Sequence, residues 1–185
     1  MLLNIDLTVV KLLNQQFLAP LNYLLIFVIY SVYGFLIFLV YFFFKTKKSN
    51  KLSHLFFTSV LGYVLVVSLK FLFARTDLGL LLGRPGNLRP YDVDPTINVI
   101  FKKTDPAFPS SHAFIAFLSF YFLPKKFRFK CLFAAYLLFL IPLASMCTGV
   151  HYPSDVIAGA VLGIIIPRII SEKITSRFVN FLSSF

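Results

Sequence analysis

The chain has 185 residues, of which 58% are hydrophobic, 24 are Phe and only 14% are charged. A soluble domain of this size could not bury so much apolar surface, so the composition excludes a water-soluble enzyme and predicts an integral membrane protein. The formal net charge is +11. Because the basic clusters flank apolar segments, this charge is typical of cytoplasmic loops, and we expect no nucleic-acid partner.

The first twenty residues, MLLNIDLTVVKLLNQQFLAP, place apolar residues at helical spacing but interrupt them with polar ones. They lack the basic start and cleavage site of a signal peptide. We expect an amphipathic helix at the membrane interface, with a short buried helix as the alternative. Five apolar segments then follow, each expected to span the membrane: residues 21–44, 52–74, 110–123, 131–150 and 154–170.

An amphipathic tail ends the chain, and no internal repeat or low-complexity linker is evident. The sequence therefore predicts an all-α integral membrane protein, with a bundle of about five transmembrane helices and an added N-terminal amphipathic helix. We expect a single domain over residues 1–185.

The loop charges predict the orientation of this bundle. Residues 45–51 and 124–130 each carry four Lys or Arg and no acidic residue, which places both loops in the cytoplasm. The mixed-charge segment 75–109 and the turn 150–153 then lie on the opposite side. We interpret 75–109 as a periplasmic active-site insert, in a multi-pass protein of the bacterial inner membrane.

One predicted helix start on the periplasmic side reads FPSSHAF, residues 108–114. Pro109 cannot lie in a helix interior, and Ser110 is a favoured N-cap residue. A helix that begins here offers free backbone N–H groups and the positive end of its dipole. Such a helix start suits an anion, particularly a phosphate.

A second helix start lies in GVHYPSDVIAG, residues 149–159. Pro153 suits the first turn of a helix, so His151 should lie just outside it. The four-residue spacing lets Asp155 reach the imidazole and fix its tautomer, which leaves the other ring nitrogen as a nucleophile or base. His112, at the other helix start, could then donate a proton.

Basic residues near this face could neutralise a multiply charged group: Lys70, Arg75, Arg84 and Arg89. Phosphoryl transfer needs mainly positioning and charge stabilisation, so we expect no metal and no cofactor. A zinc site of two His and one Asp is the alternative, but the surrounding cations favour an anion. We interpret Lys102, Lys103 and Asp105 as solvated loop charges and His54 as structural.

At these residues the chain resembles the type 2 phosphatidic acid phosphatase superfamily of membrane lipid phosphatases. Three family motifs are a Lys followed by Arg-Pro, then Pro-Ser-Gly-His, then Ser-Arg-x5-His-x3-Asp. The second is PSSH here, residues 109–112, with Ser111 where Gly is usual, and the third ends in HYPSD, residues 151–155. The resemblance covers residues 70–159. Among the members of the family, the chain resembles lipid A 1-phosphatases and undecaprenyl pyrophosphate phosphatases.

The resemblance implies a role for each matching residue. His151 would form a phosphohistidine, His112 would protonate the leaving group, and Asp155 would orient His151. The phosphate would be bound by Lys70, by the arginine of an Arg-Pro pair, and by the backbone of Ser110 and Ser111.

Two positions depart from the family pattern. Ser145 stands where the family has an arginine, six residues before the nucleophilic histidine. The Arg-Pro pair, normally seven residues after the lysine, is represented by Arg84-Pro85 or Arg89-Pro90. We favour Arg89, because the aromatic Tyr91 resembles the family pattern, and hypothesise that Arg75 or Arg84 replaces the missing arginine.

The expected reaction is metal-independent hydrolysis of a phosphate monoester or pyrophosphate on a membrane lipid. Lipid A 1-phosphate, undecaprenyl pyrophosphate and phosphatidylglycerol phosphate are the family substrates that fit. A lipid phosphotransferase with the same intermediate and a non-catalytic lipid-phosphate binder or transporter are the alternatives. The expected partners are a phosphorylated lipid and the bilayer, with no obligate protein partner.

Overall fold

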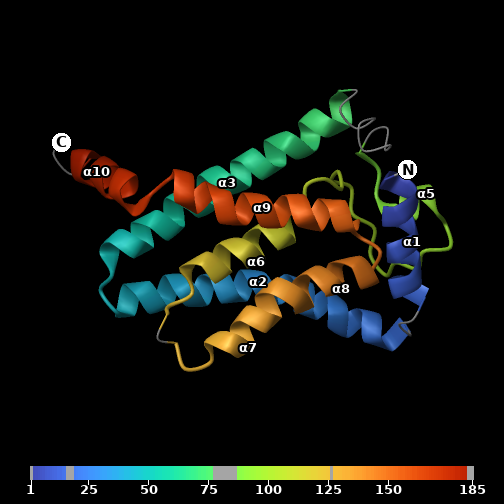
Figure 1. Cartoon of the computed structure of the whole chain (residues 1–185), viewed down its shortest axis with the longest axis horizontal. Coiled ribbons are helices and arrows are strands. Elements are labelled where there is room, and N and C mark those ends of the chain that lie inside the picture. The colour runs from blue at the N-terminus through green and yellow to red at the C-terminus, as the bar shows by residue number, and fades with distance from the viewer. Residues whose placement is uncertain (1, 16–18, 77–86, 126, 183–185) are drawn as a thin grey trace.

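The computed structural model of the chain describes residues 2–15, 19–76, 87–125 and 127–182, and it forms a bundle of helices (Figure 1). No β-strand occurs in these four ranges. The all-α fold predicted from the sequence is therefore confirmed.

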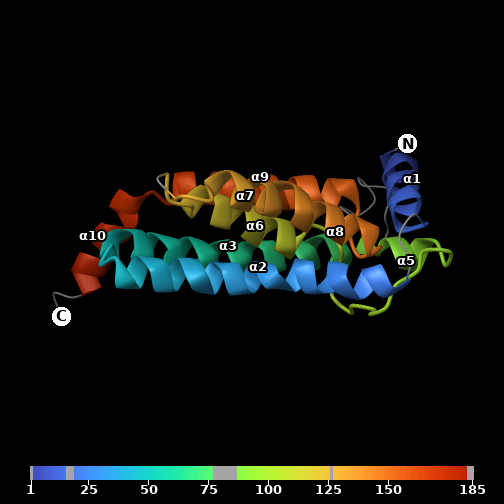
Figure 2. The ribbon, with the colours of Figure 1, turned by 90° about the horizontal axis from the view of Figure 1, so that it is seen from below.

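The bundle has two layers with one helix between them. Helices α2 (Ala19–Lys45) and α3 (Ser49–Arg75) run antiparallel through one layer. Figure 2 shows the chain from Lys130 to Cys147 and α9 (Pro153–Ile169) in the other layer. Helix α6 (Ser111–Phe122) lies between the layers, and its side chains Phe114 and Leu118 belong to the main hydrophobic core.

Three apolar stretches in the described ranges are long enough to cross a membrane: Leu21–Lys45, Ser49–Arg75 and Lys130–Cys147. Helix α9 forms a fourth candidate together with α10 (Glu172–Leu182), from which a 58° bend separates it. Helix α6 has 12 residues, which rise about 18 Å and fall short of a hydrocarbon core of about 30 Å. The third predicted span is therefore a short, centrally buried helix.

The predicted span 131–150 is not one regular helix. It consists of α7 (Lys130–Ala135), a π-helical segment η2 (Tyr136–Leu140) and α8 (Ile141–Cys147). Pro142 lies at the start of α8. Because proline cannot donate an intrahelical hydrogen bond and its ring crowds the preceding turn, the backbone widens into a π-helix just before it.

Two glycines bring α6 and α9 close together. A Cβ atom on Gly159 would lie 2.3 Å from the carbonyl oxygen of Ser110, and one on Gly163 would lie 2.5 Å from that of Phe114. Small residues four positions apart allow helix backbones in a membrane to approach in this way. The crossing places the starts of the two helices together, and the Ser110 N–H donates to the Asp155 carbonyl at 3.0 Å.

Helix α1 (Leu2–Gln15) lies across one end of the bundle, close to the short helix α5 (Pro90–Val93) (Figures 1 and 2). Two of its polar side chains face the bundle: Asp6 contacts the Ser154 hydroxyl, and Asn14 donates to the Cys147 carbonyl at 2.8 Å. Leu12 is 59% exposed on the opposite face. The predicted N-terminal helix is present, but its buried face includes polar residues that bind the bundle, and its place at the membrane interface stays a prediction.

Candidate active site

The two histidines of the sequence motifs meet at the end of the bundle that carries α1 and α5. His112 lies in the first turn of α6 and His151 in the turn before α9. Both side chains are buried, and their ring centroids are 5.9 Å apart. The helix starts predicted from Ser110 and Pro153 are both present, with Ser110 as the N-cap of α6.

Asp155 holds the turn that carries His151. Its Oδ2 accepts a hydrogen bond from the Tyr152 N–H at 2.9 Å, which caps the start of α9, and the same oxygen lies 3.4 Å from Nδ1 of His151. Burial, followed by the positive charge of Arg89, lowers the pKa of His151 below its ordinary value. The neutral form of the imidazole is therefore favoured.

His112 lies between two tyrosines and a lysine. The edges of Tyr30 and Tyr33 pack against its ring at centroid distances of 5.5 and 5.8 Å. Its Nε2 lies 3.4 Å from Nζ of Lys103. The ring is fixed in place, and its buried Nδ1 has no hydrogen-bond partner among the described residues.

Lys70 and Arg89 converge on one carboxylate beside the histidines. Nζ of Lys70 is 2.9 Å from Oδ2 of Asp105, and Nη2 of Arg89 is 2.8 Å from Oδ1. Burial alone would raise the pKa of Asp105, but Lys70 and Arg89 outweigh it and lower this pKa to about 2. Arg89 also donates from Nη1 to the Val150 carbonyl at 2.6 Å, so it is tied to the turn of His151.

The interpretation as a solvated loop charge is therefore wrong for Lys103, whereas Lys102 and Asp105 are exposed, although Asp105 is also paired. Asp105 bridges two buried cations, and Nζ of Lys103 lies 5.1 Å from the centre of the Tyr30 ring. Burial, with Arg89 nearby, lowers the pKa of Lys103 to about 8. Neither residue belongs to a periodic pattern in the sequence. In the sequence, only their position a few residues before the PSSH motif indicates that they could lie near the site.

The other predicted phosphate ligands are Ser110, Ser111 and Arg84, and they differ in what the structure shows of them. Ser110 uses its backbone N–H for Asp155 and its hydroxyl for the Ala113 N–H at 3.3 Å, so its role here is to cap α6 and join it to α9. Ser111 follows at the open helix start. Arg84 lies outside the described residues.

The position of the missing family arginine holds no cation. Ser145 is fully buried, and its hydroxyl donates to the Ile141 carbonyl at 2.9 Å. Arg75 lies at the end of α3, with its guanidinium 5.9 Å from the centre of the Phe71 ring. Among the cations whose positions are described, Lys103 is the one in contact with His112.

A cavity of about 540 Å³ opens from His112 toward α2 and α3. Three tyrosines and the loop before α6 form its walls: Tyr30, Tyr33, Tyr63, Lys103 and Asp105. Tyrosine has an apolar ring and a polar end, which suits the boundary between lipid chains and headgroups. Within the described part of the chain, no three His, Cys, Asp or Glu side chains form a group suited to a metal ion.

These features define a helical multi-pass membrane protein with a buried His–Asp pair, a second histidine and a cluster of cations at one membrane face. The model of the PAP2 superfamily, a family of phosphatases, matches residues 51–177. The chain belongs to the PAP2 superfamily, which confirms the resemblance of its motifs.

A solved structure and a curated protein show the same relationship. The crystal structure of Aquifex aeolicus LpxE superposes with a TM-score of 0.71 at 28% sequence identity, over 89% of this chain and 93% of that one. The bacitracin transport permease protein BcrC of Bacillus licheniformis is 36% identical over 94 residues, which are 48% of this chain. The match spans 44% of the BcrC chain, so less than half of that protein is represented.

Proposed function

We propose that the protein hydrolyses a phosphate monoester or a diphosphate on a membrane lipid, through a phosphohistidine at His151. The observation that carries this proposal is the burial of His151 and His112 side by side, with Asp155 at 3.4 Å from the first ring. A neutral imidazole oriented by a carboxylate is a nucleophile, and a second imidazole in its protonated form is a proton donor.

In the first step, Nε2 of His151 attacks phosphorus while Asp155 faces the protonated Nδ1. The P–N bond forms as the P–O bond to the lipid breaks, and His112 transfers its proton to the departing oxygen. In the second step, His112 takes a proton from water, whose oxygen attacks the phosphohistidine. The P–N bond breaks, phosphate leaves, and both histidines return to their starting states.

Lys103 supplies the phosphate-binding charge that the family obtains from the arginine missing at Ser145. Its ammonium group lies 3.4 Å from His112 Nε2 and lines the open cavity. The hypothesis named Arg75 or Arg84 for this purpose; the assignment replaces Arg75, which lies against Phe71 instead, and Arg84 lies outside the described residues. Lys70, Arg89 and the start of α6 complete the set of positive groups.

The site faces the periplasm in this proposal, because the strongly basic loops lie at the other end of the bundle. A lipid of the outer leaflet of the bacterial inner membrane would then reach the tyrosine-lined cavity from the bilayer. Undecaprenyl pyrophosphate and lipid A 1-phosphate fit this orientation better than phosphatidylglycerol phosphate.

The test is phosphate release by purified protein from these three lipids, in the presence of a chelator, beside His151→Ala. We expect release to fall by roughly 10³-fold or more in the variant, because the nucleophile is lost. His54→Ala is the matched control, since His54 is also buried but bonds Pro167 at the far end of the bundle.

Equal release by the wild type and His151→Ala would refute the phosphohistidine. Lipid binding without release from any of the three lipids would favour a non-catalytic binder. Transfer of the phosphoryl group to an added acceptor lipid, in place of water, would favour a phosphotransferase.

A further inference from the structure

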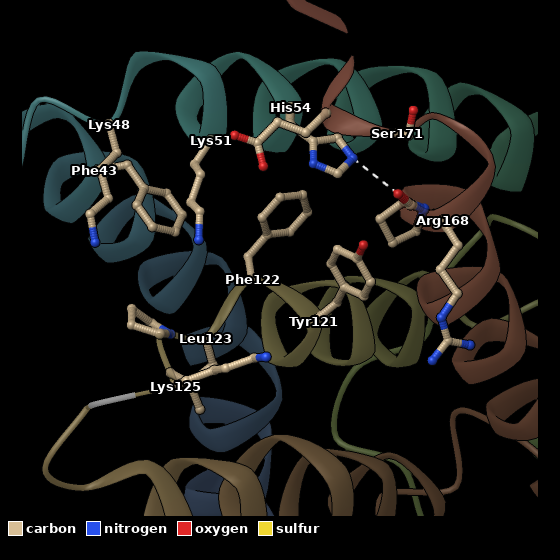
Figure 3. Close-up of a pocket in the computed structure, with 13 residues that line it drawn as sticks. Phe43, Lys48, Lys51, His54, Tyr121, Phe122, Leu123, Lys125, Arg168 and Ser171 are labelled. Atoms are coloured by element: carbon tan, nitrogen blue, oxygen red, sulfur yellow. Dashed lines mark hydrogen bonds between the residues drawn. The ribbon is translucent and has the colours of Figure 1, made fainter. Parts of the chain in front are cut away.

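A second cavity lies at the end of the bundle opposite to the two histidines (Figure 3). Its volume is about 590 Å³, within the usual range for ligand sites. The walls come from the end of α2, the first turns of α3, the end of α6 with its following loop, and the bend between α9 and α10. Nothing in the proposed reaction uses this cavity.

Four cations from three parts of the chain line this cavity: Lys48, Lys51, Lys125 and Arg168. In Figure 3, Lys51 descends from α3, Lys125 lies on the facing loop and Arg168 stands on the α9 side. Glu172 also lines the cavity, but no ion pair with these cations is found among the described residues. The cavity therefore has an excess of positive charge, which suits an anion.

The inner wall of the cavity is apolar and aromatic. Phe43 and Phe122 are buried there, and the ring of Tyr121 packs against that of Phe122 at 5.1 Å between centroids. His54 is fixed by a contact of 3.0 Å between its Nε2 and the Pro167 carbonyl. The apolar wall suits the hydrocarbon part of an amphiphile, and the cations suit its charged headgroup. A small hydrophilic anion would not use the apolar wall.

The arginine and lysines also favour a phosphate within that head. The Arg168 guanidinium can bind two phosphate oxygens at once, and the lysine side chains contribute charge from the opposite walls. All four cations lie at the end of the bundle that carries the basic loops 45–51 and 124–130. We infer that this cavity binds the phosphate-bearing headgroup of an anionic phospholipid, from the leaflet opposite to the histidine site.

The test measures thermal unfolding of the delipidated full-length protein with dioctanoyl phosphatidylglycerol. Dioctanoyl phosphatidylcholine and inorganic phosphate serve as separate comparison ligands. We expect phosphatidylglycerol at saturation to raise the Tm of the wild type by about 5 °C, because it binds only the folded state. Phosphatidylcholine and inorganic phosphate should raise it less.

The decisive variant combines Lys51→Gln, Lys125→Gln and Arg168→Gln, and it should lose the phosphatidylglycerol effect. All three side chains belong to exposed residues, so their replacement leaves the core intact. The matched control combines Lys45→Gln, Lys130→Gln and Arg177→Gln, which removes the same charge from residues outside the cavity wall. This control should respond as the wild type does.

Equal stabilisation of both triple variants would overturn the assignment to the cavity, as would the absence of any effect on the wild type. Stabilisation by inorganic phosphate alone, as strong as that by phosphatidylglycerol, would overturn the lipid and indicate a soluble phosphate. The measurement is independent of phosphate release, so its failure is distinguishable from a failure of the proposed hydrolase function.

Discussion

In the proposed function, the charge of Lys103 contributes to the affinity of the site for phosphate. Its ammonium group lies beside His112, and its pKa is lowered to about 8 by burial and by Arg89. Only the protonated form attracts phosphate. We therefore expect kcat/KM, which reports groups of the free enzyme, to fall as pH rises through about 8.

Lys103→Arg should move this alkaline limb upward by two units or more, because arginine stays protonated throughout the range. A pH profile of kcat/KM between pH 6 and 10 measures the shift. Lys102→Arg is the matched control, because Lys102 also lines the cavity but is exposed and lies near the Tyr91 ring, not against His112, so its limb should stay at the wild-type position. An unchanged limb in Lys103→Arg would refute the role of Lys103.

The Asp105 carboxylate forms ion pairs with Lys70 and Arg89, the two cations that would bind a phosphate in the proposed function. Asp105→Asn removes this charge, while Arg89 remains held by the Asp105 and Val150 carbonyls at 2.9 and 2.6 Å. We expect inorganic phosphate to inhibit the variant at concentrations about tenfold lower, a change that corresponds to about 1.4 kcal/mol. Inhibition curves for product phosphate measure this effect.

Asp94→Asn provides the control for Asp105→Asn. Asp94 belongs to the same segment, but it pairs with Lys11 of α1 at 2.7 Å and lies outside the lining of the histidine cavity. Its removal should leave phosphate inhibition unchanged. If Asp105→Asn had the same inhibition constant as the wild type, Asp105 would not compete with phosphate for the cations.

At the scale of elements, the crossing of α6 and α9 positions the site. Gly163→Ala would place a methyl group 2.5 Å from the Phe114 carbonyl, so the backbones must separate. We expect a destabilisation of about 1–3 kcal/mol, as for other overpacked interiors, visible as a lower Tm in detergent. Gly34→Ala is the control, because nothing lies within 4 Å of its added Cβ and alanine favours the helix.

The helix starts could be predicted from the sequence because their chemistry is local. Pro109 ends the preceding loop, Ser110 caps α6, and Pro153 begins α9. The helix starts predicted at residues 110 and 154 are therefore confirmed to within one residue. The position of α1 could not be predicted. It depends on bonds such as that from Asn14 to Cys147, between residues 133 positions apart in the chain.

The same distinction applies to the site. His112 and His151 could be expected to approach each other because each is tied to a helix start on the same face. Lys103 and Asp105 lie in an irregular loop, where no periodicity indicates the direction of a side chain. The partners of Asp105 are Lys70 and Arg89, and Lys103 contacts His112 and the Tyr30 ring, so only the folded structure reveals the cluster.

At the scale of the whole molecule, the two ends of the bundle differ in charge and in chemistry. One end carries the histidines, the tyrosine-lined cavity and α1, and the other carries the basic loops and the second cavity. The proposed function requires that the histidine end faces the periplasm. Because charge asymmetry alone supports this orientation, it should be measured directly.

Single cysteines at the two ends report the orientation. Cys131 and Cys147 are first replaced by serine and alanine, and Ser49→Cys or Asn98→Cys is then added, since both positions are exposed. We expect a membrane-impermeant maleimide to label Asn98→Cys in cells whose outer membrane is permeabilised, and to label Ser49→Cys only after the inner membrane is opened. The reverse pattern would place the histidines in the cytoplasm, and the proposed substrate would then have to present its phosphate in the inner leaflet.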